Sequence, residues 1–199
     1  MTIYVFLNNQ YADWEIGYLL PELIGDSPAP HIHKNKREVV TFGLNGESVR
    51  SMGGLRVTPE MTLDKVDAGT IDALILPGGE FWSDFNQPKF DALVRDVAMR
   101  GKLVAGICAA TAYLGRLGLL DGVEHTSNSQ EFLRRSAPKY AGAALYKNQS
   151  VVAHCNIVTA SGLMAVDFTD KLLRLLDVYE PRICDIWYNM FKHGIEPRC

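Results

Sequence analysis

Residues 103–115, LVAGICAATAYLG, carry the pattern that decides the fold. The unbroken apolar run 103–107 is typical of a buried strand, and we expect a helix from about Ala109 to Leu117 to follow it. Cys108 stands at the junction, where small neighbours allow the strand and the helix to meet at a sharp turn. This pattern is that of a nucleophile elbow in which cysteine occupies the place of the more usual serine.

Strands and helices alternate upstream of this junction. The hydrophobic periodicity predicts a helix that starts near Asp13 and bends at Pro21, and a second helix whose apolar stripe ends at Gly101. The segment 47–58 has two short β-like runs around a Gly-Gly pair, which indicates a hairpin. Compact apolar runs predict strands at Thr2–Leu7, Glu38–Leu44 and Asp72–Leu76. This alternation predicts an α/β fold with a mostly parallel sheet and helices on both faces.

The second half of the chain is less regular. A polar turn at Asp121 and Gly122 precedes β-like runs at about Ala143–Tyr146 and Val151–Ala160, and two helices close the chain. The last helix has an apolar stripe that must dock against the domain or against a second subunit. No linker or internal repeat interrupts residues 1–199, so we expect a single domain.

Composition narrows the classes of partner. The 20 basic and 23 acidic residues give a formal net charge of -3, which leaves no electrostatic footprint for nucleic acid or an anionic membrane. Four cysteines without a CxxC pair suggest neither a disulfide framework nor a zinc ribbon. No run approaches the about 18 apolar residues of a membrane span, and the N-terminus has no basic export signal. We therefore expect a cytoplasmic protein with a small-molecule or protein partner.

Two interpretations of Cys108 follow from its position. The N-terminus of the next helix favours a thiolate, so a functional Cys108 is expected to have a lowered pKa. Alternatively, Cys108 is a small buried hydrophobic residue, as many free cysteines are.

Glu15 and a glycine loop are candidates to act with it. Glu15 lies four residues before Leu19 on an apolar helical stripe, where a buried, protonated carboxyl group would donate a hydrogen bond to a thiolate. Its alternative role is a half-exposed acid that favours the helix N-terminus. The loop 77–79, Pro-Gly-Gly, follows a predicted strand, and its backbone N–H groups would form an oxyanion hole unless it is only a strand-ending turn.

With these segments in view, the chain resembles the ThiJ/PfpI superfamily, which includes the Parkinson-disease protein deglycase and the PfpI-type intracellular proteases and is similar to class I glutamine amidotransferases. The resemblance rests on five motifs in order: DWE at 13–15, LPGG at 76–79, AGICAAT at 105–111, GLLDGVEHTSN at 118–128 and TASG at 159–162. It implies a flavodoxin-like three-layer sandwich that forms a homodimer. It also implies that Cys108 is the reactive thiol, that Glu15 is the protonated acid, and that Gly79 and Ala109 supply backbone N–H donors.

The chain departs from the family pattern at its histidines. Many enzymatic members have a histidine about twenty residues after the cysteine, where this chain has Asn128. His125 would project to the opposite face if the segment is a strand, so a packed or surface role is expected. Ala109 replaces the histidine that follows the cysteine in protease-like members, and no His-x-Glu pair follows Cys108, which argues against peptidase and glutaminase activity. The candidate periphery of the site comprises Gly78, His125, Asn128, Trp14 and Trp82.

The residues and the resemblance together leave three functional hypotheses. The leading one is a cysteine-dependent enzyme of hydrolase or glyoxalase/deglycase type that acts on a small electrophile without a cofactor. The second is a redox-sensing stress protein in which Cys108 is oxidised without steady turnover. The third is a scaffold or chaperone-like dimer. His31 and His33 form a His-x-His pair, but we expect solvated loop histidines and no metal site.

Overall fold

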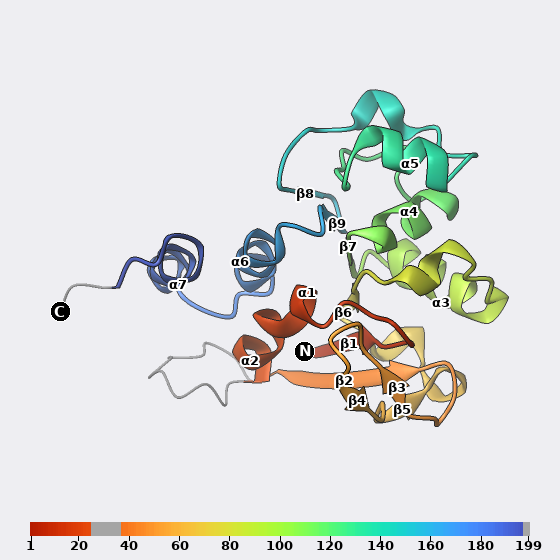
Figure 1. Cartoon of the computed structure of the whole chain (residues 1–199), viewed down its shortest axis with the longest axis horizontal. Coiled ribbons are helices and arrows are strands. Elements are labelled where there is room, and N and C mark those ends of the chain that lie inside the picture. The colour runs from red at the N-terminus through yellow and green to blue at the C-terminus, as the bar shows by residue number, and fades with distance from the viewer. Residues whose placement is uncertain (25–36, 197–199) are drawn as a thin grey trace.

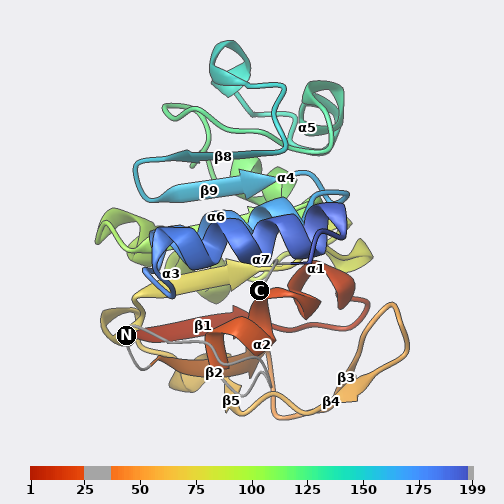
Figure 2. The same ribbon diagram turned by 90° about the vertical axis from the view of Figure 1, so that its left-hand side faces the viewer.

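The computed structural model describes residues 1–24 and 37–196, and its centre is a seven-stranded sheet (Figures 1 and 2). Adjacent strands are parallel except for the last pair, in which β8 runs antiparallel to β9. The expected α/β fold with a mostly parallel sheet is therefore confirmed. In spatial order the strands are β5 (Met61–Thr62), β2 (Glu38–Gly43), β1 (Thr2–Phe6), β6 (Ala73–Leu76), β7 (Leu103–Ile107), β9 (Ile157–Ala160) and β8 (Val151–His154).

Helices cover both faces of the sheet (Figure 1). One face is covered by α1 (Trp14–Gly17), α2 (Leu19–Ile24) and α6 (Ala165–Leu175), and α7 (Pro181–His193) packs on the outside of α6. The other face is covered by α3 (Pro88–Met99) and α4 (Ala109–Arg116), with α5 (Gln130–Ser136) against α4. Short 3-10 helices complete the chain at η1 (Leu63–Lys65), η2 (Ala68–Thr70), η3 (Glu80–Ser83) and η4 (Gly142–Leu145).

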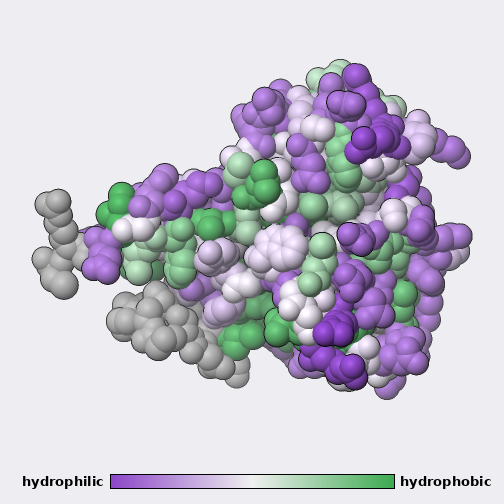
Figure 3. All heavy atoms as spheres, in the orientation of Figure 1, coloured by the Kyte–Doolittle hydropathy of each residue, from purple (hydrophilic) through white to green (hydrophobic). Residues whose placement is uncertain are grey.

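The alternation of side chains along the strands divides the core into two layers. On β1, Tyr4 and Phe6 pack into the layer beneath α3 and α4, whereas Ile3 and Val5 pack into the layer beneath α1, α2 and α6. All four are at most 5% exposed, so both faces of the strand are buried, as a continuous apolar run predicts. Hydrophilic and hydrophobic residues are interspersed on the outer face seen in Figure 3.

The parallel strands bring the predicted site residues to one edge of the sheet. β1, β6, β7 and β9 all end at this edge, and the chain order switches direction between β1 and β6. Ligands of open α/β sheets bind outside the carboxyl ends of the strands at such a switch point. Glu15 follows β1, the Pro77–Gly79 loop follows β6, and Cys108 follows β7.

Several local predictions need correction or extension. The first helix breaks at Tyr18 rather than at Pro21, because Pro21 lacks an N–H and its ring crowds the carbonyl of Gly17 four residues earlier. The predicted β-like run at 143–146 is instead η4 and the bridge residue Tyr146. The hairpin at 47–58 is confirmed as β3 (Val49–Arg50) and β4 (Arg56–Val57), and helix α5 was not predicted.

Other features concern the last helix and the limits of the described chain. Helix α7 docks through Cys184 and Trp187, which are buried against the core. No helix within the described ranges is long and apolar enough to cross a membrane. Within the same ranges, no cluster of at least three His, Cys, Asp or Glu residues could hold a metal ion. His31 and His33 lie outside the described residues.

Candidate active site

Cys108 occupies a strained turn between β7 and α4. Its backbone angles, φ 58° and ψ -125°, are rare for a residue with a side chain, and such conformations cost about 1–3 kcal/mol. The Cys108 N–H donates to the carbonyl of Ala160 at 3.0 Å, and Thr111 N–H donates to the Cys108 carbonyl at 3.1 Å. Gly106 lets the helix approach, since a Cβ there would lie 2.9 Å from Leu114 Cδ1. The elbow geometry expected from the sequence is therefore present.

Glu15 lies in the first turn of α1 and is completely buried. Its Oε2 accepts a hydrogen bond from Gly78 N–H at 2.6 Å. Burial raises the pKa of Glu15 to about 7, although the Gly78 N–H and the Cys108 thiol partly offset that rise. Oε1 is buried without a hydrogen-bond partner of good geometry among the described residues. A proton on Oε1 would therefore have the thiol as its acceptor, with no competing acceptor from the part of the chain that the structure describes.

Two glycines hold the thiol and the carboxyl group together. A Cβ on Gly162 would lie 2.7 Å from Cys108 Sγ and 3.0 Å from Glu15 Oε1. A Cβ on Gly78 would lie 2.7 Å from both Cys108 Cβ and Glu15 Oε2. Real Cβ atoms do not approach other atoms so closely, so any larger residue at either position would displace one of the two groups. Gly162, which the sequence interpretation did not assign to the site, is thus part of it.

Asn128, an exposed residue, donates a hydrogen bond to the thiol of Cys108. Its Nδ2 lies 3.4 Å from Cys108 Sγ. Its Oδ1 accepts from Gly162 N–H at 2.9 Å and from Ser161 Oγ at 3.4 Å, which fixes the amide with its NH₂ group toward the sulfur. The residue that replaces the family histidine therefore supplies a hydrogen-bond donor and cannot act as a base.

A buried hydroxyl pair supports the elbow from behind. Thr111 Oγ1 donates to the Cys108 carbonyl at 2.5 Å and lies 2.6 Å from Ser127 Oγ. Thr111 is 0% exposed and Ser127 is 3% exposed, so these hydroxyl groups have little access to water. Neither residue was assigned to the site from the sequence.

The prediction of a lowered pKa for Cys108 is wrong. Burial and the negative charge of Glu15 raise the pKa of Cys108 to about 11, against the smaller lowering effects of Asn128 and the Ala109 N–H. The helix N-terminus does donate to the sulfur, as expected, but burial and the nearby carboxylate outweigh it. The two groups therefore titrate as a coupled pair that holds one proton between about pH 7 and pH 11.

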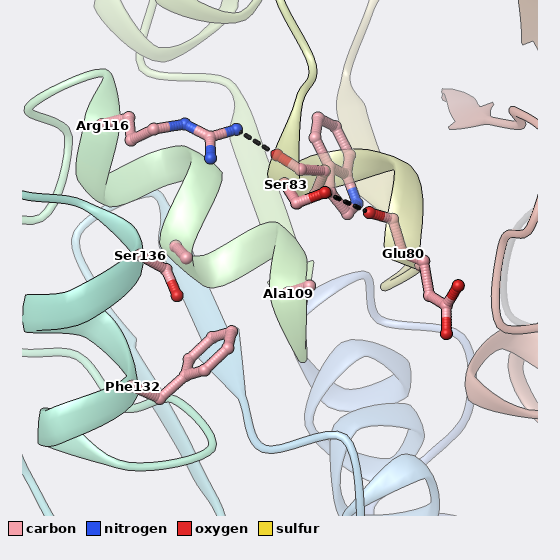
Figure 4. A pocket seen from close by; sticks show the side chains of 9 residues that line it. Glu80, Ser83, Ala109, Arg116, Phe132 and Ser136 are labelled. Carbon is pink, nitrogen blue, oxygen red and sulfur yellow. Dashed lines mark hydrogen bonds between the residues drawn. The ribbon is translucent and has the colours of Figure 1, made fainter.

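A cavity of about 400 Å³ opens beside the elbow (Figure 4). Gly79 and Ala109, the two predicted backbone donors, both line it. Trp82 forms one wall and is fixed by the hydrogen bond from its Nε1 to the carbonyl of Pro77, at 2.8 Å. Trp14 is half exposed on α1 and does not line this cavity. The opposite wall comes from α4 and from the unpredicted α5.

His125 does not join the site. It is completely buried, and its two ring nitrogens bond to the carbonyl of Val123 at 2.7 Å and to the hydroxyl of Tyr140 at 2.5 Å. Burial lowers the pKa of His125, which favours a neutral ring. The packed role expected for this histidine agrees with its position, and its inclusion in the candidate periphery was wrong.

Comparisons with known proteins agree with this arrangement. The model of the DJ-1/PfpI family matches residues 1–175. An uncharacterized protease of Bacillus subtilis, YoaZ, is 35% identical over 193 residues, 96% of this chain and 90% of the relative. Protein/nucleic acid deglycase 2 of Escherichia coli is 30% identical over 67% of this chain and 78% of its own. The crystal structure of the thiJ/pfpI family protein from Bacillus anthracis has a TM-score of 0.91 at 34% identity, covering 98% of this chain and 92% of that chain.

Proposed function

Because this chain belongs to the DJ-1/PfpI family, we propose that it is a cysteine-dependent enzyme of hydrolase or glyoxalase/deglycase type that acts on a small carbonyl compound. The observation that carries the proposal is the pairing of the Cys108 thiol with the buried carboxyl group of Glu15 at a strained elbow. The names of the protease and deglycase relatives support a family activity of this kind.

The shared proton activates the thiol. In the form that reacts, the proton of Sγ has moved to Glu15 Oε1, so the sulfur is a thiolate and the carboxyl group is neutral. This transfer removes the negative charge that opposes the thiolate, and the new O–H group donates to the sulfur. Asn128 Nδ2 and the Ala109 N–H stabilise the same thiolate.

The first chemical step is addition to the carbonyl group. The thiolate attacks the carbonyl carbon, the electron pair of the C=O π bond moves to the oxygen, and the oxygen takes the proton from Glu15. Gly79 and Ala109 line the cavity where their N–H groups would stabilise the developing negative charge. The product of this step is a thiohemiacetal, with the Glu15 carboxylate regenerated.

The site favours substrates from which no amine must be expelled. Asn128 cannot protonate a leaving amine, and Ala109 is not a histidine. With an α-oxoaldehyde, the Glu15 carboxylate can take the hydrogen of the attacked carbon as a proton and deliver it to the neighbouring carbon, while the hydroxyl proton of the thiohemiacetal passes to the oxygen of that neighbouring carbon. The product is the thioester of an α-hydroxy acid. Hydrolysis by one water molecule then releases an α-hydroxy acid and restores the thiol. Glyoxalase chemistry, in which no amine leaves, therefore demands less of this site than deglycation or peptide hydrolysis, both of which must release an amine.

The test is turnover by purified protein with α-oxoaldehydes, their adducts with amino acids, esters and peptides. We expect turnover of the oxoaldehyde class, lost in Cys108→Ala and strongly reduced in Glu15→Gln. Cys155→Ala removes an exposed cysteine and is the matched control, expected to keep full activity. Absence of turnover for every class, or turnover that survives Cys108→Ala, would contradict the proposal.

A redox role is the second candidate, favoured by the donors around the sulfur. Asn128 Nδ2 and the Ala109 N–H can both bond to the oxygens of an oxidised cysteine. Two equivalents of hydrogen peroxide would convert the thiolate to a sulfinate with release of two water molecules. Peptide mass spectrometry after limited peroxide treatment should find oxidation concentrated at Cys108, whereas preferential oxidation of the exposed Cys155 would exclude a selective sensor.

A further inference from the structure

The cavity beside the elbow has a charged far end that the chemistry described above does not use. Arg116 is half-buried at the last turn of α4 and lines the cavity together with Gly79 and Ala109. Figure 4 shows its guanidinium group on the wall that lies away from Ala109. Ala109, whose N–H donates to the sulfur of the preceding Cys108, thus lies at one part of the cavity wall, and the Arg116 cation lies at another, while Cys108 itself stands beside the cavity rather than in its lining.

The guanidinium group of Arg116 is held in place without a carboxylate partner from residues 1–24 or 37–196. One of its N–H groups donates to the carbonyl of Trp82 at 2.5 Å, and its carbon lies 5.8 Å from the centre of the Tyr113 ring. Among the described residues, Arg116 forms no ion pair. Asp84 and Asp91 act on its charge only at longer range. The carboxylate of Asp91 instead accepts a hydrogen bond from Tyr113 Oη at 2.7 Å. Since arginine has five N–H donors, most remain available to a ligand.

The remaining walls fit a short, largely apolar chain. Trp82, Ala112 and Phe132 add apolar surface to the cavity wall, and Ser83 and Ser136 add hydroxyl groups. Glu80 also contributes to the wall, but its carboxylate is exposed and points away from Arg116 in Figure 4. Among the described lining residues Arg116 is the one cation, which matches a single carboxylate better than a doubly charged phosphate.

The length of α4 sets the distance that a ligand must span. Arg116 is seven residues after Ala109, which is about 10 Å along a helix axis. Long side chains on a helix lean toward its N-terminus, so the guanidinium group lies somewhat nearer to Ala109 than this rise alone implies. A ligand that touches both ends therefore has its carboxylate several bonds from its carbonyl group.

We propose that this cavity is a carboxylate-binding subsite, and that the enzyme's substrates carry a carboxylate that binds Arg116 while their carbonyl group meets Cys108. The inference rests on the proposed function, since it presumes that Cys108 is the nucleophile. It narrows the substrate class from small carbonyl compounds in general to carboxylate-bearing ones with an apolar middle segment.

The experiment measures alkylation of Cys108, which does not depend on turnover. The two probes are an iodoacetamide that carries a butanoate on its nitrogen and the neutral N-butyl iodoacetamide, with labelling at each cysteine followed by mass spectrometry. Wild type should react with the anionic probe about tenfold faster than with the neutral one, the scale expected for one charge-assisted interaction. In Arg116→Gln this preference should fall to about one, while the rate with the neutral probe changes little.

Two controls keep the outcome unambiguous. Arg135→Gln makes the same charge change at an exposed position of α5 that does not line the cavity, and it should keep the preference. If Arg116→Gln does not fold, the preference of wild type should still decline as salt is added. Equal rates with both probes in wild type, or a preference that survives Arg116→Gln, would overturn the subsite while leaving the nucleophile intact. Failure of both probes to label Cys108 would instead refute the proposed function, and the subsite with it.

Discussion

The buried carboxyl group of Glu15 predicts an unusual dependence of stability on pH. Burial raises its pKa in the folded protein from 4.5 to about 7. A folded-state pKa above the unfolded value means that the contribution of the group to stability is fully present below about pH 4.5 and is lost as the pH rises through about 7. The loss amounts to about 3 kcal/mol, since each pH unit between the two pKa values corresponds to 1.36 kcal/mol.

Glu15→Gln should remove this loss. The glutamine carbonyl can still accept from Gly78 N–H, and its NH₂ group can face the thiol in place of the protonated Oε1. At about pH 8 we expect the variant to be more stable than wild type by about 3 kcal/mol, equivalent to a rise in Tm of about 6–12 °C for a chain of this size. Without the carboxylate charge, the pKa of Cys108 should also fall below about 11.

The assay is urea unfolding at a series of pH values between about 4 and 8, with the free energy of unfolding extrapolated to water. Glu80→Gln, which neutralises an exposed carboxylate, is the matched control and should change stability by less than about 0.5 kcal/mol at every pH. A constant difference between Glu15→Gln and wild type across this range, or a less stable variant at alkaline pH, would refute the assignment of a buried carboxyl group with a raised pKa.

Three further substitutions test the surroundings of the thiol. Gly162→Ala forces a Cβ to within 2.7 Å of the sulfur and should lower the free energy of unfolding by about 1–3 kcal/mol in thermal or urea unfolding. The control Gly122→Ala, with nothing within 4 Å of its new Cβ, should be nearly neutral. Equal losses of stability in the two variants would contradict the close packing around Gly162. Thr111→Val leaves the buried hydroxyl group of Ser127 without its partner and should lower the free energy of unfolding by about 1–3 kcal/mol. The control Thr169→Val removes a buried hydroxyl group that has no partner among the described residues, so it should be neutral or stabilising in the same assay. Asn128→Ala removes a donor to the sulfur and should raise the pKa of the thiol, seen as slower alkylation at a fixed alkaline pH; faster alkylation would exclude this role.

The fold could be predicted because its strands are buried on both faces. Runs such as 2–7 and 103–107 are continuously apolar, and only a sheet covered on both sides buries such strands completely. The elbow at Cys108 was equally visible, since the small residues beside it serve the turn itself. Burial of a strand on both faces and the space needed at a turn depend on residues that are neighbours in the sequence, so both can be predicted from it.

The remaining features depend on contacts between distant segments. Helix α5 has a Ser129 cap but only two adjacent apolar residues, Phe132 and Leu133, which do not form a helical stripe over several turns. The role of Gly162 follows from how closely the end of β9 approaches Glu15 and Cys108. The direction of the shift in the thiol pKa depends on a balance between burial and helix-terminal hydrogen bonds, and the sequence indicates both effects without showing which is larger.

The two margins of the sheet also affect how the protein behaves at high concentration. β5, on one margin, has only two residues, and β8, on the other, has four. An incoming strand from another molecule would find few free backbone groups along β5, and beside β8 the side chain of His154 already accepts from the backbone N–H of Glu124 at 2.7 Å. Short edge strands are a means by which proteins avoid edge-to-edge aggregation. The sheet therefore offers an incoming strand only short stretches of edge backbone, which disfavours its growth by strand addition.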